Sequence, residues 1–399
     1  IRKVTKVPTA GGEPNVGSIL GTFLPTFVTI PAVGTFVTFL IFSGLLLALP
    51  IVYFFAAKAR RVVCAVSVAV FAASACVSPL TGFAFWENRS TIAYEGESIY
   101  NYLQVKNLSD RTILSTNVLF GVQSVTMKDK GLTGMYYDTA LAAPALASHA
   151  DSALILGMGT GTYARQLRQY YPDMRVTGVE IDQKITDLAG RYFDEPSDIE
   201  VSTYDGRAWL AASENTYDVI MVDAYQDITI PFQMSSAEFF DLVRSHLNPG
   251  GVMVVNMNMI SDGRRSINEA LTDTISSVFG SDAVRTADVP GTTNRELFAR
   301  NAGGSGDKAG LSDPAALESA AYDRTHSHEL ASTMADVAGR MQAVDDPAER
   351  ADATILTDDK APVEVLGMRA IDNIIAEEAG PYRELLKTEG IAGLLKAVQ

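Results

Sequence analysis

The chain has 399 residues, 47% of them hydrophobic, and a net charge of −15, so it is long enough for more than one domain. Residues 1–85 carry six Lys or Arg and one acid, whereas the remainder carries 26 basic and 46 acidic residues. So acidic a region repels phosphate backbones, and we expect no nucleic acid partner. The two cysteines, Cys64 and Cys76, provide neither a disulfide framework nor a zinc spacing, and we expect no metal site.

Residues 1–86 are expected to form a transmembrane region of two or three helices. Residues 36–56 and 62–85 are uncharged and each long enough to cross a hydrocarbon core of about 30 Å. Residues 16–33 are also uncharged, and membrane helices tolerate the prolines and glycines in this stretch. The basic residues at 58–61 favour a multi-pass protein with that loop in the cytoplasm. A full second span would lead the rest of the chain outside, but we expect it on the cytoplasmic face, where nucleoside-cofactor chemistry normally takes place.

Residues 87–149 are expected to form a small antiparallel β domain that caps the entrance of the next domain. Apolar and polar residues partly alternate over residues 98–105, and Leu108-Ser-Asp-Arg-Thr112 is a turn signal. Residues 112–125 supply further strand-like sequence.

Residues 150–300 are expected to form a Rossmann-like α/β domain, because strands and helices alternate along them. The predicted strands are 153–156, 175–180, 199–202, 219–222 and 252–256, and the predicted helices include 163–171, 183–192 and 237–247. This pattern predicts a doubly wound parallel sheet that binds ligands outside the carboxyl ends of its strands.

The last hundred residues give weaker signals. Residues 301–353 are rich in Ala, Gly, Ser and Asp and are expected to be a variable insertion with two short surface helices. Residues 354–399 are expected to form a C-terminal strand and a helical tail. Asp358 and Asp359 are expected at a helix cap or turn.

A glycine-rich loop is the most informative motif of the chain. Gly157, Gly159 and Gly161 follow the apolar run Leu154-Ile-Leu, and a turn of this kind lets a ligand approach the backbone at the start of the next helix. Glu180 ends the next predicted strand, 23 residues after Gly157, where it can accept hydrogen bonds from ribose hydroxyls. The Gly-x-Gly-x-Gly spacing resembles the S-adenosylmethionine fold of class I methyltransferases rather than a nicotinamide dehydrogenase.

The order of several motifs resembles the spermidine synthase (polyamine aminopropyltransferase) family. Besides the glycine loop, these motifs are Ser98-Ile-Tyr-Asn-Tyr102, Gly121-Val-Gln-Ser124, Met135-Tyr-Tyr-Asp138, Val179-Glu-Ile-Asp182, Tyr204-Asp-Gly206, Tyr217-Asp-Val-Ile-Met-Val-Asp223 and Gly250-Gly-Val-Met253. The resemblance covers roughly residues 97–300. The segments Gly17-Ser-Ile-Leu-Gly-Thr-Phe-Leu-Pro25 and Thr357-Asp-Asp-Lys-Ala-Pro362 resemble membrane-fused members, which carry a transporter-like helical region before the synthase domain.

The resemblance implies that decarboxylated S-adenosylmethionine is the co-substrate, a small-molecule amine is the acceptor, and no cofactor is tightly bound. Asp223 would orient and deprotonate the attacking amine. On the donor side, Glu180 would bind the ribose hydroxyls and Asp205 would accept from the adenine amino group. The other donor-binding residues implied are Gly157, Gly159, Thr160, Gly161 and Asn101. The amine-binding residues implied are Tyr136, Tyr137, Tyr225 and Asp227, and a homodimer is a further expectation.

Four departures from the family pattern keep other functions open. Thr160 stands where the family usually has an Asp that holds the donor's amino group, and a neutral hydroxyl pairs less strongly with an ammonium. Asn101 replaces a usual Gln, Tyr137 replaces a His or Gln, and Asp227 follows Asp223 after three residues instead of two. An S-adenosylmethionine-dependent methyltransferase on the same fold is therefore one alternative. The expected membrane region motivates a second alternative, a non-catalytic membrane transporter or sensor that binds an adenosyl ligand or a polyamine.

Overall fold

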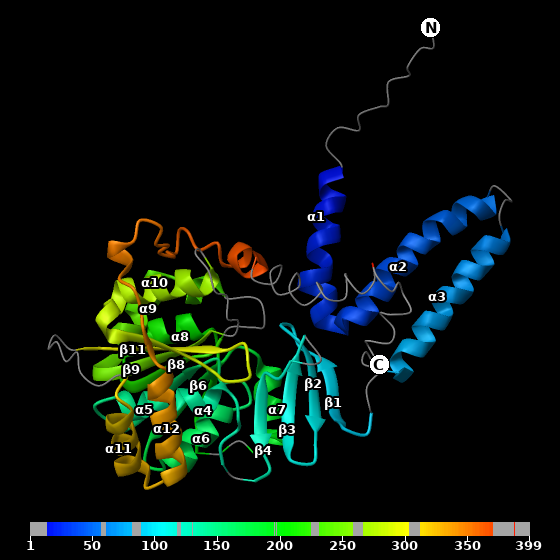
Figure 1. The fold of residues 1–399 in the computed structure, drawn as a ribbon. Helices are drawn as coiled ribbons and strands as arrows, with labels where there is room; N and C mark the ends of the chain where they lie inside the picture. The colour runs from blue at the N-terminus through cyan, green and yellow to red at the C-terminus, as the bar shows by residue number, and fades with distance from the viewer. Residues whose placement is uncertain are drawn as a thin grey trace. The chain divides into compact units, whose positions relative to one another are not determined.

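The computed structural model describes residues 14–56, 61–81, 89–117, 121–129, 131–194, 196, 198–224, 231–257, 266–302, 312–369 and 387 (Figure 1). The chain divides into two compact units. The first comprises Ile1–Leu108 and Leu114–Val122, and the second comprises Ser109–Ile113 and Gln123–Gln399.

The first unit begins with long apolar helices. These are α1 (Pro14–Leu24), the π-helical turn η1 (Pro25–Thr29), α2 (Ile30–Ala56) and α3 (Arg61–Thr81). The backbone of α2 departs from helical geometry at Gly34, with φ 82° and ψ 167°, a conformation that glycine adopts readily. The N–H of Thr35, directly after this break, donates to Oε2 of Glu97 at 2.8 Å. The carboxylate thus satisfies a donor that the interrupted helix leaves free.

One stretch of the described helices, Gly17–Phe54, is long and apolar enough to cross a membrane. The apolar part of α3 is shorter and spans Arg61–Cys76. By length and composition, the described residues therefore contain one candidate span, where the sequence predicted two or three.

The predicted small β-sheet is present. It consists of β1 (Ile92–Glu97), β2 (Tyr102–Asn107), β3 (Arg111–Thr116) and β4 (Ser124–Met127), in chain order. Strands β1 and β2 pair antiparallel through a tight turn in which the N–H groups of Tyr100 and Asn101 donate to Ser98 Oγ at 3.1 and 2.9 Å. This hydroxyl–backbone turn ends the first strand and reverses the chain.

The second unit is built on an eight-stranded sheet in the order β12-β10-β11-β9-β8-β5-β6-β7. The strands are β5 (Ser152–Leu156), β6 (Arg175–Glu180), β7 (Glu200–Thr203), β8 (Tyr217–Val222), β9 (Leu247–Met257), β10 (Val284–Asp288), β11 (Arg295–Arg300) and β12 (Gln342–Ala343). Strands β7, β6, β5, β8 and β9 are parallel, and β11, β10 and β12 continue the sheet antiparallel. The strand order reverses at β5, where this fold binds its ligands.

Helices cover both faces of this sheet, with α8, α9 and α10 on one face and α4, α5, α6 and α12 on the other (Figure 1). Their bounds are α4 (Tyr136–Ala140), α5 (Ala142–Leu146), α6 (Thr162–Tyr170), α7 (Gln183–Tyr192), α8 (Gly206–Ala212), α9 (Ala237–Ser245), α10 (Ile267–Phe279), α11 (Pro314–Thr325) and α12 (His328–Arg340). The 3₁₀ turns are η2 (Phe232–Met234), η3 (Ser281–Ala283) and η4 (Pro347–Glu349). Alternate residues of the central strands, such as Leu154, Val222 and Val255, pack into the core formed with Leu210, Phe239 and Leu271 of α8–α10.

The five predicted strands are all present, and β6 and α7 have the predicted bounds. Strands β10 and β11 were not predicted, because they form an antiparallel hairpin outside the alternation of strand and helix. Helices α11 and α12 fall where two surface helices were expected, but one face of each is buried. On α12 the buried residues include Leu330, Met334 and Val337, whose spacing is that of an amphipathic helix packed on the domain.

The C-terminal segment returns to the edge of α8. Residues 358 and 359 form the turn closed by a bridge between Thr357 and Lys360, so Asp358 lies in a turn as expected. Its carboxylate accepts two hydrogen bonds from the guanidinium of Arg207, at 2.7 and 2.6 Å, and one from Ser236 Oγ at 2.5 Å. These bonds join the turn to the start of α8, and a short helix follows over residues 363–369.

Candidate active site

The glycine loop lies at the carboxyl end of β5 and requires glycine for two reasons. Gly157, Gly159 and Gly161 all have positive φ, of 86°, 57° and 81°. A Cβ on Gly157 would lie 2.5 Å from the carbonyl oxygen of Asp223, and one on Gly159 would lie 2.6 Å from Ser124 Oγ. The loop therefore combines left-handed backbone with close packing, and it leads directly into α6.

Glu180 ends β6 and holds the glycine loop. Its Oε2 accepts from the N–H of Gly159 at 2.8 Å, and its Oε1 accepts from the N–H of Asp182 at 3.0 Å. Burial raises the pKa of Glu180 to about 7, although these backbone hydrogen bonds favour the carboxylate. The structure thus places Glu180 beside the loop, at the strand end predicted for the ribose-binding acid.

Asp205 and Thr160 border the same end of the sheet. Asp205 follows β7 and caps α8, with Oδ1 accepting from the N–H of Ala208 at 2.8 Å. Thr160 is fully buried in the loop, and its N–H donates to Ser124 Oγ at 3.2 Å. Its hydroxyl oxygen has no hydrogen-bond partner among the residues that the structure describes.

Asp223 is the first residue after β8, and two side chains hold its carboxylate. Its Oδ2 accepts from the hydroxyl of Tyr136, and its Oδ1 accepts from Nδ2 of Asn256, both at 2.8 Å. Asn256 is itself held by Asn294, whose Nδ2 donates to its Oδ1 at 2.8 Å. Burial raises the pKa of Asp223 to about 7, against the two hydrogen bonds that favour its charged form. A carboxylate with fixed orientation and a pKa near neutrality is suited to act as a general base.

Tyr136 and Tyr137 open α4 and are both buried. Their ring centroids are 4.0 Å apart, and the ring planes are inclined by 33°. The hydroxyl of Tyr136 donates to the acid, whereas the hydroxyl of Tyr137 donates to the backbone oxygen of Gln123 at 2.7 Å. The two hydroxyls also interact with each other, and burial, together with the charge of Asp223, raises the pKa of both phenols.

The structure brings most of the candidate residues of the second unit together at the carboxyl ends of the parallel strands. Asn101 belongs to the first unit, where its Oδ1 accepts from Nδ2 of Asn117 at 2.9 Å. Tyr225 and Asp227 lie outside the described residues. Asn256 was not predicted as a site residue. A polar residue directly after an apolar run is the signal that identified Asp223, and the same signal would have found Asn256.

No group of three or more His, Cys, Asp or Glu side chains in the described ranges is placed to hold a metal ion. The carboxylates of Glu180 and Asp223 are held by hydrogen bonds.

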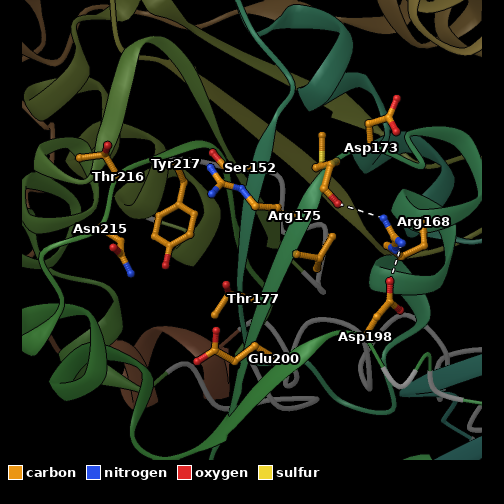
Figure 2. Close-up of a pocket in the computed structure, with 12 residues that line it drawn as sticks. Ser152, Arg168, Asp173, Arg175, Thr177, Asp198, Glu200, Asn215, Thr216 and Tyr217 are labelled. Carbon is orange, nitrogen blue, oxygen red and sulfur yellow. Dashed lines mark hydrogen bonds and ion pairs between the residues drawn. The ribbon is translucent and has the colours of Figure 1, made fainter.

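A pocket of about 470 Å³ lies at the amino ends of the parallel strands, opposite to the end that carries the glycine loop (Figure 2). Ser152, Arg175, Glu200 and Tyr217, the first residues of β5, β6, β7 and β8, all line it. Arg168 on its rim is paired with Asp198. Because the glycine loop follows the carboxyl end of β5, this pocket is separate from the site described above.

This fold and this arrangement of loop and acids define a transferase with a Rossmann-like methyltransferase fold. Residues 135–296 match the family described as "Spermine/spermidine synthase domain". A "Probable polyamine aminopropyl transferase" of Bifidobacterium longum (strain NCC 2705) is 71% identical over 355 residues, which are 88% of this chain and 79% of the relative. The chain therefore belongs to the polyamine aminopropyltransferase (spermidine synthase) family, and the predicted resemblance is confirmed.

Two more distant matches agree. A "Polyamine aminopropyltransferase" of Vibrio vulnificus (strain CMCP6) is 30% identical over 178 residues, 42% of this chain and 60% of the relative. The crystal structure of a probable spermidine synthase from Corynebacterium glutamicum ATCC 13032 superposes with a TM-score of 0.51 and 22% identity, over 67% of this chain and 96% of that one. The latter match shows that the fold is shared.

Proposed function

We propose that this enzyme transfers the aminopropyl group of decarboxylated S-adenosylmethionine to a polyamine such as putrescine and releases methylthioadenosine. The observation that carries the proposal is Asp223, a carboxylate oriented by Tyr136 and Asn256 beside the glycine loop. A protonated amine has no free lone pair, so an acid with a pKa near 7 can both attract the amine and take its proton.

On the donor side, Gly157–Gly161 supplies backbone that a nucleoside can approach closely. Glu180 receives the ribose hydroxyls, and Asp205 receives the adenine amino group. Both acids end neighbouring parallel strands or follow them directly, which is where this fold binds nucleosides. Thr160 lies in the loop at the position predicted to meet the donor's tail. Asn101, Tyr137, Tyr225 and Asp227 stay predictions for the remaining contacts.

The reaction is a substitution at the carbon next to the sulfonium. The nitrogen lone pair of the amine forms the new C–N bond, and the C–S bond breaks with its electron pair on sulfur. Neutral methylthioadenosine leaves, and Asp223 takes the proton that the nitrogen loses. Holding nitrogen and carbon in line at one sheet edge supplies much of the remaining acceleration.

The first test measures methylthioadenosine release by the purified full chain. We expect Asp223→Asn to lower kcat/KM by about 10²- to 10⁴-fold, the usual contribution of a general base. Asp241→Asn is the matched control, because Asp241 is exposed on α9 and pairs with Arg244. A D223N protein that keeps wild-type activity would contradict the proposal.

The nucleoside product separates the other two hypotheses. Release of S-adenosylhomocysteine from intact S-adenosylmethionine, without turnover of the decarboxylated donor, would identify a methyltransferase. Binding of the donor or a polyamine without any turnover would identify a sensor. Membership of the aminopropyltransferase family supports neither of these outcomes.

We further propose that the N-terminal region anchors the enzyme in a membrane as a multi-pass protein, with the catalytic unit on the cytoplasmic face. The support is the apolar stretch Gly17–Phe54, together with the shorter apolar helix that follows it. Leu46, Leu49 and Val62 expose their side chains, as expected for helices that face lipid. A homodimer remains a prediction that light scattering of the solubilised protein tests.

A further inference from the structure

A carboxyl group that the reaction above does not use lies close to Asp223. Glu296 is the second residue of β11 and is fully buried. Neither of its carboxyl oxygens has a hydrogen-bond partner in the part of the chain that the structure describes. A buried polar group left without a partner costs about 1–3 kcal/mol, and a charged group costs more. Packing alone does not account for such a side chain.

Sheet geometry places Glu296 on the same face as Asp223. Glu296 pairs with Asn256 in the antiparallel register of β11 and β9, and Asn256 donates to Asp223. Side chains alternate between the two faces of a sheet. The adjacent residues Val255 and Leu297 belong to the core cluster formed with α8–α10. Asn256 and Glu296 therefore point to the opposite face, and the three polar residues form a row across β8, β9 and β11.

The surroundings of Glu296 suit a cation that comes from outside the protein. Burial raises the pKa of Glu296 well above its usual range, and the neighbouring Asp223 raises it further. No described Lys or Arg lowers the pKa of Glu296. The neighbouring phenol of Tyr163 is engaged elsewhere, since its hydroxyl donates to the backbone oxygen of Ala140 at 3.0 Å. Without a ligand, Glu296 thus lies beside a second carboxyl group and has no cationic partner among the described residues.

We propose that Glu296 receives the far ammonium group of a diamine acceptor whose near amine is held by Asp223. This inference rests on the proposed aminopropyl transfer and names the residue that selects a dicationic acceptor. Neighbouring strands are about 4.8 Å apart, so the backbones at Asp223 and Glu296 are separated by about 10 Å. The nitrogens of a four-carbon diamine are about 6 Å apart by standard bond lengths. Each charge-assisted hydrogen bond adds about 2.8 Å, so an extended diamine with one such bond at each end spans about 12 Å, which is comparable with the separation of the two backbones.

Selectivity follows from the buried position. A monoamine of the same length would occupy Asp223 but leave Glu296 without a partner. A site built to hydrogen-bond a substrate group discriminates against the analogue that lacks it, because its own buried polar atoms stay unpaired. Glu296 would therefore determine acceptor specificity, while Asp223 carries out the chemistry.

The test compares 1,4-diaminobutane with n-butylamine as acceptors for the full chain, with release of methylthioadenosine as the readout. We expect the wild type to favour the diamine by at least about 10-fold in kcat/KM. Glu296→Gln should reduce this preference by about 10- to 100-fold, which corresponds to about 1.5–3 kcal/mol for a hydrogen bond to a charged group. The change should appear in the KM for the diamine, with turnover of n-butylamine retained. Glu200→Gln, an exposed site on β7, is the matched control and should keep the preference.

Two results would overturn the inference. The first is equal kcat/KM for the two amines in the wild type, a measurement that does not depend on whether the variant folds. The second is an E296Q protein with the melting temperature and the diamine preference of the wild type. Failure of the wild type to transfer an aminopropyl group to either amine would instead contradict the proposed function, and this inference would be rejected with it.

Discussion

Two acids of the site, Glu180 and Asp223, have a pKa raised to about 7 by burial, but their partners differ in kind. Glu180 accepts from backbone N–H groups of the loop and of Asp182, which no substitution other than proline removes. Asp223 accepts from the side chains of Tyr136 and Asn256, which can be altered singly. The proton affinity of Asp223 is therefore the one that a point mutation can tune.

Removing the hydroxyl of Tyr136 should move the pH dependence of the reaction. The hydroxyl donates to the carboxylate and lowers the pKa of Asp223, so Tyr136→Phe should raise that pKa. A hydrogen bond to a charged group is worth about 1.5–3 kcal/mol, so the acidic limb of the kcat/KM profile should shift upward by about 1–2 pH units. The rate should fall at pH 7 and recover at higher pH.

Tyr163→Phe is the matched control for this profile, because Tyr163 is also buried and its hydroxyl donates to the backbone oxygen of Ala140 and not to Asp223. An acidic limb that stays in place in Y136F, or that shifts equally in Y163F, would show that the Tyr136 hydrogen bond does not set the pKa of Asp223.

At the scale of elements, the alternation of strands and helices predicted the five parallel strands, because most of them are short, largely apolar runs before a turn or helix. The positions of Glu180 and Asp223 at strand ends followed from the same pattern. Glu296 was not predicted, since its place beside Asp223 depends on β11 pairing with β9. That antiparallel pairing joins distant segments, and no local periodicity reports it. The buried faces of α11 and α12 depend on non-local packing in the same way.

The glycine loop and helix α7 should respond in opposite ways to the same substitution. Gly157→Ala introduces a Cβ at φ 86° that would lie 2.5 Å from a backbone oxygen, so we expect a loss of about 1–3 kcal/mol in the free energy of unfolding. Gly190→Ala places a methyl group on α7 where nothing lies within 4 Å, and we expect a gain of about 0.5–1 kcal/mol. Urea denaturation of both variants measures the difference. A G157A protein as stable as the wild type would show that the loop relaxes around the added carbon.

At the scale of the whole molecule, charge and hydropathy are divided along the chain. The part after residue 85 has 20 more acids than bases, so anionic lipid surfaces repel it. The proposed attachment to a membrane therefore depends on the apolar helices of the first unit. The sequence showed this division from composition alone. The number of helices that can cross a membrane depends on the lengths of the helices, which only the structure provides.

Attachment of the full chain to vesicles should resist both high salt and alkaline carbonate, because burial of apolar helices and not charge holds it. A protein that lacks residues 1–86 should remain in the soluble fraction. Flotation with phosphatidylcholine vesicles measures both. Release of the full chain by carbonate would contradict the membrane-embedded arrangement.

The bonds between Asp358 and Arg207 also determine where this enzyme can be shortened. The match to the synthase domain ends at residue 296, yet Asp358 neutralises an arginine two residues after the proposed adenine-binding Asp205. Leu356 and Val363, on either side of that turn, are part of the same hydrophobic core as α8 and α9. A fragment cut at the end of the family match would expose this core and leave Arg207 without its carboxylate. The smallest fragment that keeps the donor side intact therefore extends past residue 363.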